Sequence, residues 1–105
     1  MWTVEFLPVA LQELEKLPAD MRASFERIVR LIQAFGIERV HEPYIRHVEG
    51  RLWEMRLKGR DGIARALYVT AVGRRIIVLR TFVKKTRKTP RSEIELALQR
   101  AKELR

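Results

Sequence analysis

The segment that decides the fold is residues 52–83, which read LWEMRLKGRDGIARALYVTAVGRRIIVLRTFV. Residues 52–58 alternate apolar with charged side chains: Trp53, Met55 and Leu57 alternate with Glu54, Arg56 and Lys58. This period of two is typical of a half-buried strand. Turn-forming residues at 59–62 and 72–74 separate this strand from two further apolar segments, 63–71 and 75–83. The segment therefore predicts an antiparallel meander of three strands.

The first strand of this meander is expected to have two different faces. Because alternate side chains lie on the same face, Trp53 and its apolar neighbours should pack on the helices as core. The opposite face should then show Glu54, Arg56 and Lys58 in a row. The third strand is apolar at both parities over residues 76–79, which predicts that it is covered on both faces.

Helical periodicity flanks the meander on both sides. Upstream we expect a short strand at 2–7, a helix from 8 to 17 that Pro8 begins, and a second helix from 20 to 35 that Gly36 ends. Residues 37–50 show no clear period and are expected to be an irregular connection. Downstream, Thr89 should cap a helix with Pro90 in its first position. The order β-α-α-β-β-β-α predicts an α+β fold, an antiparallel sheet with two N-terminal helices on one face and a C-terminal helix.

Composition bounds the class of protein. A chain of 105 residues, 47% hydrophobic and 33% charged, predicts one globular domain over residues 1–105. It has no cysteine, which excludes a disulfide framework, a thiol nucleophile and a cysteine zinc site. No apolar run is long enough to span a bilayer and residues 1–6 do not resemble a signal peptide, so we expect a cytoplasmic protein without a membrane partner.

The positive charge lies in one block of the chain. The formal net charge is +9, yet residues 51–91 alone hold thirteen Lys and Arg against two Asp and Glu, a net +11. Like charges placed together destabilise a fold, so such a block favours a polyanionic ligand, nucleic acid above all. We expect the cations to converge from separate strands into one concave patch formed by Arg56, Lys58, Arg65, Arg80, Lys84, Lys85, Arg87, Lys88 and Arg91.

Three strings of this sequence are similar to a known family: LWEMR at 52–56, RALY at 65–68, and FVKKTRKTP at 82–90 running into EIELA at 93–97. They resemble the HigB branch, the phage-derived Gp49-like group, of the RelE/ParE superfamily of type II toxin–antitoxin toxins. The resemblance covers nearly the whole chain. It implies the RelE-like β-α-α-β-β-β-α fold and endoribonuclease activity on mRNA, typically on the ribosome, by attack of a 2′-hydroxyl on the adjacent phosphate.

The resemblance also implies roles for individual residues. Arg56 matches a strand position credited with contact to the transition state or with the role of base, and Arg65 matches a phosphate-binding arginine. Lys85, or its neighbour Lys84, matches a basic residue that contacts the leaving group or the phosphate. Glu54 stands where RelE has a lysine, and no tyrosine corresponds to the catalytic one near the final helix of RelE.

The residues themselves leave the acid and the base open. Internal attack needs a proton acceptor, charge stabilisation at phosphorus and a proton donor, but no metal and no cofactor. Arginine is a poor base because it stays protonated, so Glu54 is a candidate acceptor. Its other interpretation is an ion pair that neutralises Arg56 or Lys58. His41 and His47 have a suitable pKa range, but single histidines in loops are mostly exposed and inert, which is the favoured interpretation of both.

The family implies partners as well as an activity. We expect a cognate antitoxin encoded in the same operon, of the helix-turn-helix type, mRNA on the ribosome as the target, and operator DNA bound only through the antitoxin complex. Two other functions remain open: a ParE-like toxin that poisons DNA gyrase, and a non-catalytic nucleic-acid-binding module. The basic block argues against the first, and the lack of an aromatic platform among the basic residues argues against the second.

Overall fold

The computed structural model describes residues 1–104, which form three α-helices, one 3₁₀ helix and a five-stranded sheet. The elements in chain order are β1 (Thr3–Phe6), α1 (Pro8–Glu15), α2 (Ala19–Phe35), η1 (Ile37–Arg39), β2 (Ile45–Glu49), β3 (Leu52–Gly59), β4 (Gly62–Ala71), β5 (Arg75–Lys84) and α3 (Arg91–Lys102). The α+β class and the three-stranded meander are as predicted. None of the helices within residues 1–104 is long and apolar enough to cross a membrane.

The sheet differs from the predicted one in two ways. Its strand order is β1-β5-β4-β3-β2. The segment 37–50, which was expected to be irregular, contains β2, and this strand pairs antiparallel with β3. At the other edge β1 pairs parallel with β5, so the sheet is mixed and the prediction of a purely antiparallel sheet is wrong. The physical reason is that no hairpin turn joins β1 to its neighbour, so nothing forces the two strands to run in opposite directions.

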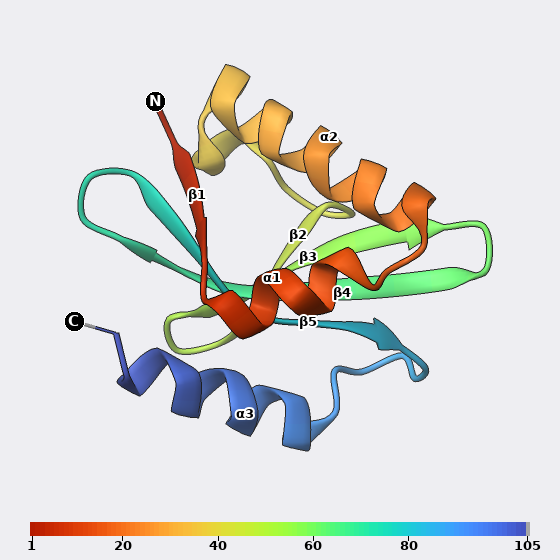
Figure 1. The fold of residues 1–105 in the computed structure, drawn as a ribbon. Coiled ribbons are helices and arrows are strands. Elements are labelled where there is room, and N and C mark those ends of the chain that lie inside the picture. The colour runs from red at the N-terminus through yellow and green to blue at the C-terminus, as the bar shows by residue number, and fades with distance from the viewer. Residues whose placement is uncertain (105) are drawn as a thin grey trace.

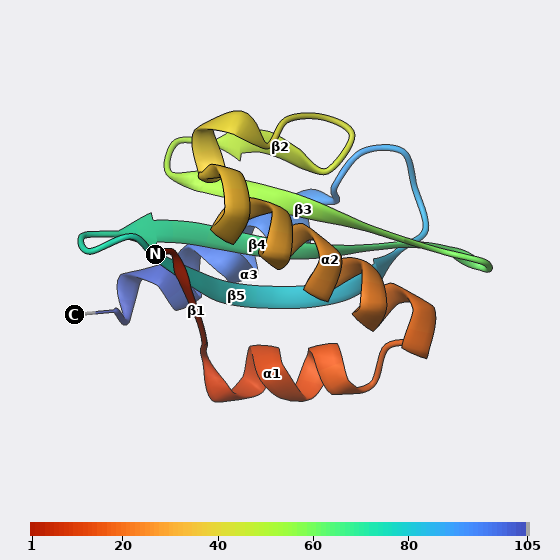
Figure 2. The same cartoon turned by 90° about the horizontal axis from the view of Figure 1, so that it is seen from above.

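Helices cover both faces of the sheet (Figures 1 and 2). On the face of α1 and α2 the buried core includes Phe25, Ile28, Met55 and Tyr68. On the face of α3 a second core includes Leu67, Leu79, Phe82 and Ala97. Residues 76–79 of β5 are all buried, as their apolar run predicts, because each core takes the side chains of one parity.

The first meander strand corrects two expectations. Trp53 was expected in the core but is 39% exposed, because it lies at the pairing with the edge strand β2, where its ring meets the edge of the His47 ring at 4.9 Å. Glu54 was expected on an exposed row but is buried. Its face of the sheet is covered by the segment that leads into α3, since the Thr89 hydroxyl donates a hydrogen bond to it at 2.5 Å.

The predicted C-terminal end of α2 is correct, whereas the predicted N-cap of α3 is wrong. Gly36 ends α2 with a φ of 87° and its N–H donates to the Ile32 carbonyl at 2.8 Å, as a terminating glycine should. At α3 the N-cap is Pro90, whose carbonyl accepts from the Ile94 N–H, and the helix begins at Arg91. The prediction of Thr89 as N-cap is wrong because its hydroxyl is used by Glu54 instead.

Candidate nucleic-acid interface

A basic groove lies at one end of the sheet, on the side of α3. Four strands each contribute one cation, and the loop between β5 and α3 (Figure 2) closes one side of the groove. The groove has a volume of about 690 Å³ and is lined by Arg46, Arg56, Gly62, Ile63, Arg65, Lys84, Lys85, Thr86, Arg87 and Lys88. We call this the basic groove. Ten residues were predicted as site residues, namely the nine cations of the expected patch and Glu54, and six of these ten line the groove.

Strand register explains why these side chains meet. Arg56 on β3 lies directly opposite Arg65 on β4, and Arg46 on β2 lies opposite Glu54. Paired residues project to the same face of a sheet and lie about 5 Å apart. The sheet therefore sets the spacing of these charges, while the loop residues lie at the rim.

A buried ion pair forms the floor of the groove. Arg65 Nη1 donates to Glu54 Oε2, and both side chains are only 2% exposed. The other carboxylate oxygen accepts from the Thr89 hydroxyl, so both Glu54 oxygens are occupied. Arg65 Nε has no hydrogen-bond partner among the described residues. Because Nε is itself buried, Arg65 acts on an anion in the groove through its charge rather than through this donor.

The groove also perturbs two pKa values. Burial and the neighbouring Arg56 and Arg46 hold the pKa of Arg65 below its ordinary value, although Glu54 opposes the shift. Burial, and next the charge of Arg65, lower the pKa of Lys84. A lysine with a lowered pKa is a better proton donor than an ordinary one, so Lys84 combines charge with possible proton transfer.

Most cations of the groove have no acidic partner within residues 1–104. Arg56, Lys84, Lys85, Arg87 and Lys88 make no salt bridge in that part of the chain. Arg46 pairs only with Glu42, an exposed contact of 3.1 Å that contributes little. The unneutralised charge can therefore act on a ligand.

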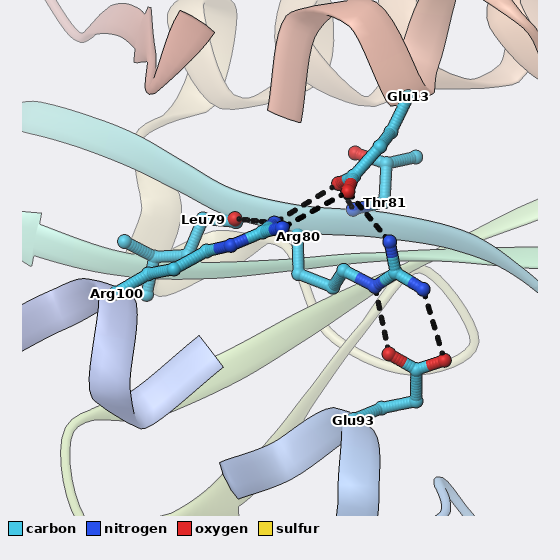
Figure 3. A network of polar contacts seen from close by, with 6 residues as sticks. All are labelled: Glu13, Leu79, Arg80, Thr81, Glu93 and Arg100. Carbon is cyan, nitrogen blue, oxygen red and sulfur yellow. Dashed lines mark hydrogen bonds and ion pairs between the residues drawn. The ribbon is translucent and has the colours of Figure 1, made fainter. Parts of the chain in front are cut away.

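Arg80 does not belong to the groove. Its Nε and Nη2 donate to Glu93 at 2.7 and 3.1 Å, and its Nη1 donates to Glu13 at 2.5 Å (Figure 3). Arg100 joins the network by donating to Glu13 and to the Leu79 carbonyl. Arg80 thus ties α1 and α3 to β5, and it is a structural residue where a nucleic-acid contact was predicted.

Four further candidates lie apart from the groove. Arg91 pairs with Glu49 and Glu95. Lys58 faces a neighbouring cavity rather than the groove. His47 meets Trp53 edge-on and bonds the Gly50 carbonyl, while His41 lines a separate apolar pocket. Among the described residues no cluster of His, Asp or Glu could hold a metal ion.

Two residues that shape the site were missed at the level of sequence: Arg46, which lines the groove, and Thr89, which bonds Glu54. Arg46 lies on β2, whose residues Ile45–Glu49 show no alternation that would reveal a strand. Thr89 was interpreted as a helix cap, the commoner role of a threonine before proline. Only the paired strands and the burial of Glu54 reveal these roles.

Comparisons with known proteins show which family this chain is similar to. Residues 12–102 match the family described as phage-derived protein Gp49-like (DUF891). Two curated proteins named "Probable endoribonuclease HigB1", from Mycobacterium tuberculosis strains CDC 1551 / Oshkosh and ATCC 25618 / H37Rv, are each 30% identical over 100 residues. Each alignment covers 95% of this chain and 77% of the relative.

Proposed function

The chain belongs to the phage-derived Gp49-like family of HigB-like toxins in the RelE superfamily, and from that premise we propose that it is an endoribonuclease toxin acting on mRNA. The observation that carries the proposal is the basic groove, where cations from four strands converge and most of the lining cations have no acidic partner within residues 1–104. The named relatives support ribonuclease activity, and the groove offers a surface for a sugar-phosphate chain.

The groove supplies charge where the reaction develops it. In the proposed step the 2′-oxygen of one nucleotide forms a bond to the adjacent phosphorus while the bond from phosphorus to the 5′-oxygen breaks. The products are a 2′,3′-cyclic phosphate and a 5′-hydroxyl. Arg56 and Arg65 stabilise the negative charge that grows on the phosphoryl oxygens, and fixed donors of this kind contribute most to such catalysis.

Two protons move in this step. We assign proton donation to the leaving 5′-oxygen to Lys84, because it lies in the groove and its pKa is lowered. The proton of the 2′-hydroxyl passes to water. Glu54 is not assigned as its acceptor, since both of its oxygens are already bonded to Arg65 and Thr89. The reaction requires neither a metal ion nor an external nucleophile.

The family also indicates the setting. Toxins of such modules are held inactive by an antitoxin, and we propose a helix-turn-helix partner from the same operon, with operator DNA bound through that complex. We further propose that cleavage takes place on the translating ribosome in the cytoplasm. The exposed Lys85, Arg87 and Lys88 at the rim offer contacts to ribosomal RNA phosphates as well as to the message.

The direct test is induced expression with mapping of mRNA 5′ ends by primer extension. Wild type should arrest growth and create new ends within translated messages. The Lys84→Ala/Lys85→Ala variant should do neither, whereas the charge-matched Lys16→Ala/Lys102→Ala, at the C-terminal ends of α1 and α3 and away from the groove, should act like wild type. Arrest with intact messages would overturn the proposal and, if DNA gyrase were inhibited, would favour the gyrase-poisoning alternative.

A further inference from the structure

A second cavity adjoins the basic groove. It has a volume of about 400 Å³, and its lining residues are Ser24, Arg27, Ile28, Pro43, Tyr44, Arg56, Lys58 and Ile63. We call it the side pocket. Arg56 and Ile63 line both the side pocket and the basic groove, so a chain bound in the groove has direct access to the pocket.

The side pocket exists because the sheet is incomplete at this edge. β2 pairs with β3 only as far as Met55, so the rest of β3 is paired with β4 on one side and has no neighbouring strand on the other. The Ser24 hydroxyl of α2 occupies part of that edge by donating to the Lys58 carbonyl at 2.6 Å. The pocket therefore lies between α2, the open half of β3 and the segment before β2.

Backbone contacts fix the aromatic residue at the rim. The Tyr44 carbonyl accepts from the Arg56 N–H at 2.9 Å, and the Tyr44 N–H donates to the His41 carbonyl at 2.9 Å. The Tyr44 side chain is 40% exposed and belongs to neither core. The backbone of Tyr44 is thus fixed next to Arg56, and its exposed side chain lines the same pocket as Arg56.

The lining combines two kinds of chemistry. Arg27, Arg56 and Lys58 form no salt bridge or side-chain hydrogen bond within residues 1–104, and the pocket has no acidic lining residue. Ile28, Pro43 and Ile63 supply apolar walls. A ligand that matches this lining carries a flat ring and a nearby negative charge, which describes a nucleotide.

We propose that the side pocket binds one nucleotide of the RNA strand whose backbone occupies the basic groove. Its base stacks on Tyr44, and the phosphate beside it is bound by Arg27 and Lys58. This inference rests on the proposed function and adds to it a subsite that selects how the strand enters. An acidic peptide segment could satisfy the cations but would leave the tyrosine ring and the apolar walls without a role.

The test is the affinity of the full chain for a short fluorescent single-stranded RNA with 2′-O-methyl sugars, which cannot be cleaved, measured by anisotropy at low salt. Tyr44→Ala should weaken binding about 5- to 150-fold, the usual effect of losing one stacked base. Tyr44→Phe, which keeps the ring, should stay within about twofold of wild type. Arg27→Ala should reduce the slope of log affinity against log salt by about 0.7, the value for one phosphate contact on a single strand.

A second arm compares the same RNA carrying an abasic site at each position in turn. At one position the abasic site should weaken binding to wild type but not to Tyr44→Ala, because the variant has already lost that stack. Equal losses in both proteins, or unchanged affinity of Tyr44→Ala, would overturn the side-pocket assignment. If Lys84→Ala still weakened binding in that case, the proposed function would stand without the subsite. If neither wild type nor Lys84→Ala bound RNA, both proposals would fall together.

Discussion

Glu54→Gln separates a folding role from a catalytic one. The substitution removes the carboxylate charge but keeps the volume, and it leaves Arg65 buried without its counter-ion, beside Arg46, Arg56 and Lys84. Removing one member of a buried ion pair costs about 3–5 kcal/mol, because the remaining charge is desolvated and unpaired. Since a domain of this kind has roughly 5–15 kcal/mol of stability, we expect the variant to lose about a fifth of it or more.

Urea denaturation at neutral pH measures this loss. With a slope of roughly 1.5–2 kcal/mol per molar urea, the midpoint should fall by about 2 M. The control is Glu95→Gln, which removes a carboxylate from the exposed pair with Arg91 and should change stability by less than about 0.5 kcal/mol. A Glu54→Gln protein with an unchanged midpoint but no RNA cleavage would refute the reasoning, because Glu54 would then act in the chemistry rather than in the fold.

Three further predictions concern other parts of the chain. Gly59→Ala should cost about 1–3 kcal/mol in denaturation experiments, because its new methyl group would lie 2.7 Å from Met21 Cγ. Burial raises the pKa of Glu13, but hydrogen bonds led by the one from Arg100 outweigh it and the net pKa is lowered from 4.5. Glu13 therefore contributes stability above about pH 4.5 that is lost as pH falls through the lowered pKa, and Glu13→Gln should flatten the acid side of the stability curve. Cleavage that depends on protonated Lys84 should decline as pH rises, and because the pKa of Lys84 is lowered, this decline should begin below the ordinary lysine value of 10.5. A single-turnover pH profile without this decline would show that Lys84 is not the proton donor.

The sequence predicts those parts of the fold that periodicity determines alone. β3, β4 and β5 lie where apolar segments separated by turns place them, and β3 and β4 are joined by a tight hairpin. The helices α1 and α2 follow from apolar residues three or four apart. In each case the spacing of apolar residues within the element itself predicts both its secondary structure and its buried face.

Elements that depend on a partner were not predictable in the same way. β2 has no alternating pattern, and it forms because the edge of β3 is available for pairing. The burial of Glu54 depends on Thr89, which follows it by 35 residues and reaches it only once α3 has packed on the sheet. The side pocket likewise depends on the backbone hydrogen bond between Tyr44 and Arg56. Because this contact forms only in the folded protein, the sequence did not predict an aromatic residue beside the cations.

The basic block shows why net charge predicts a ligand class but not a site. Acidic residues from elsewhere in the chain neutralise three of its arginines: Glu5 pairs with Arg75, Glu13 with Arg80 and Glu49 with Arg91. These pairs attach β1, α1, β2 and α3 to the rest of the molecule and are no longer available to a polyanion. Within the described residues, the cations of the groove have one buried carboxylate as a partner, Glu54, and this residue lies in the basic block, residues 51–91. Affinity for RNA should therefore follow the number of unpaired cations on this one face, so that removing Lys84 weakens binding while removing Arg80, with equal loss of charge, mainly weakens the fold.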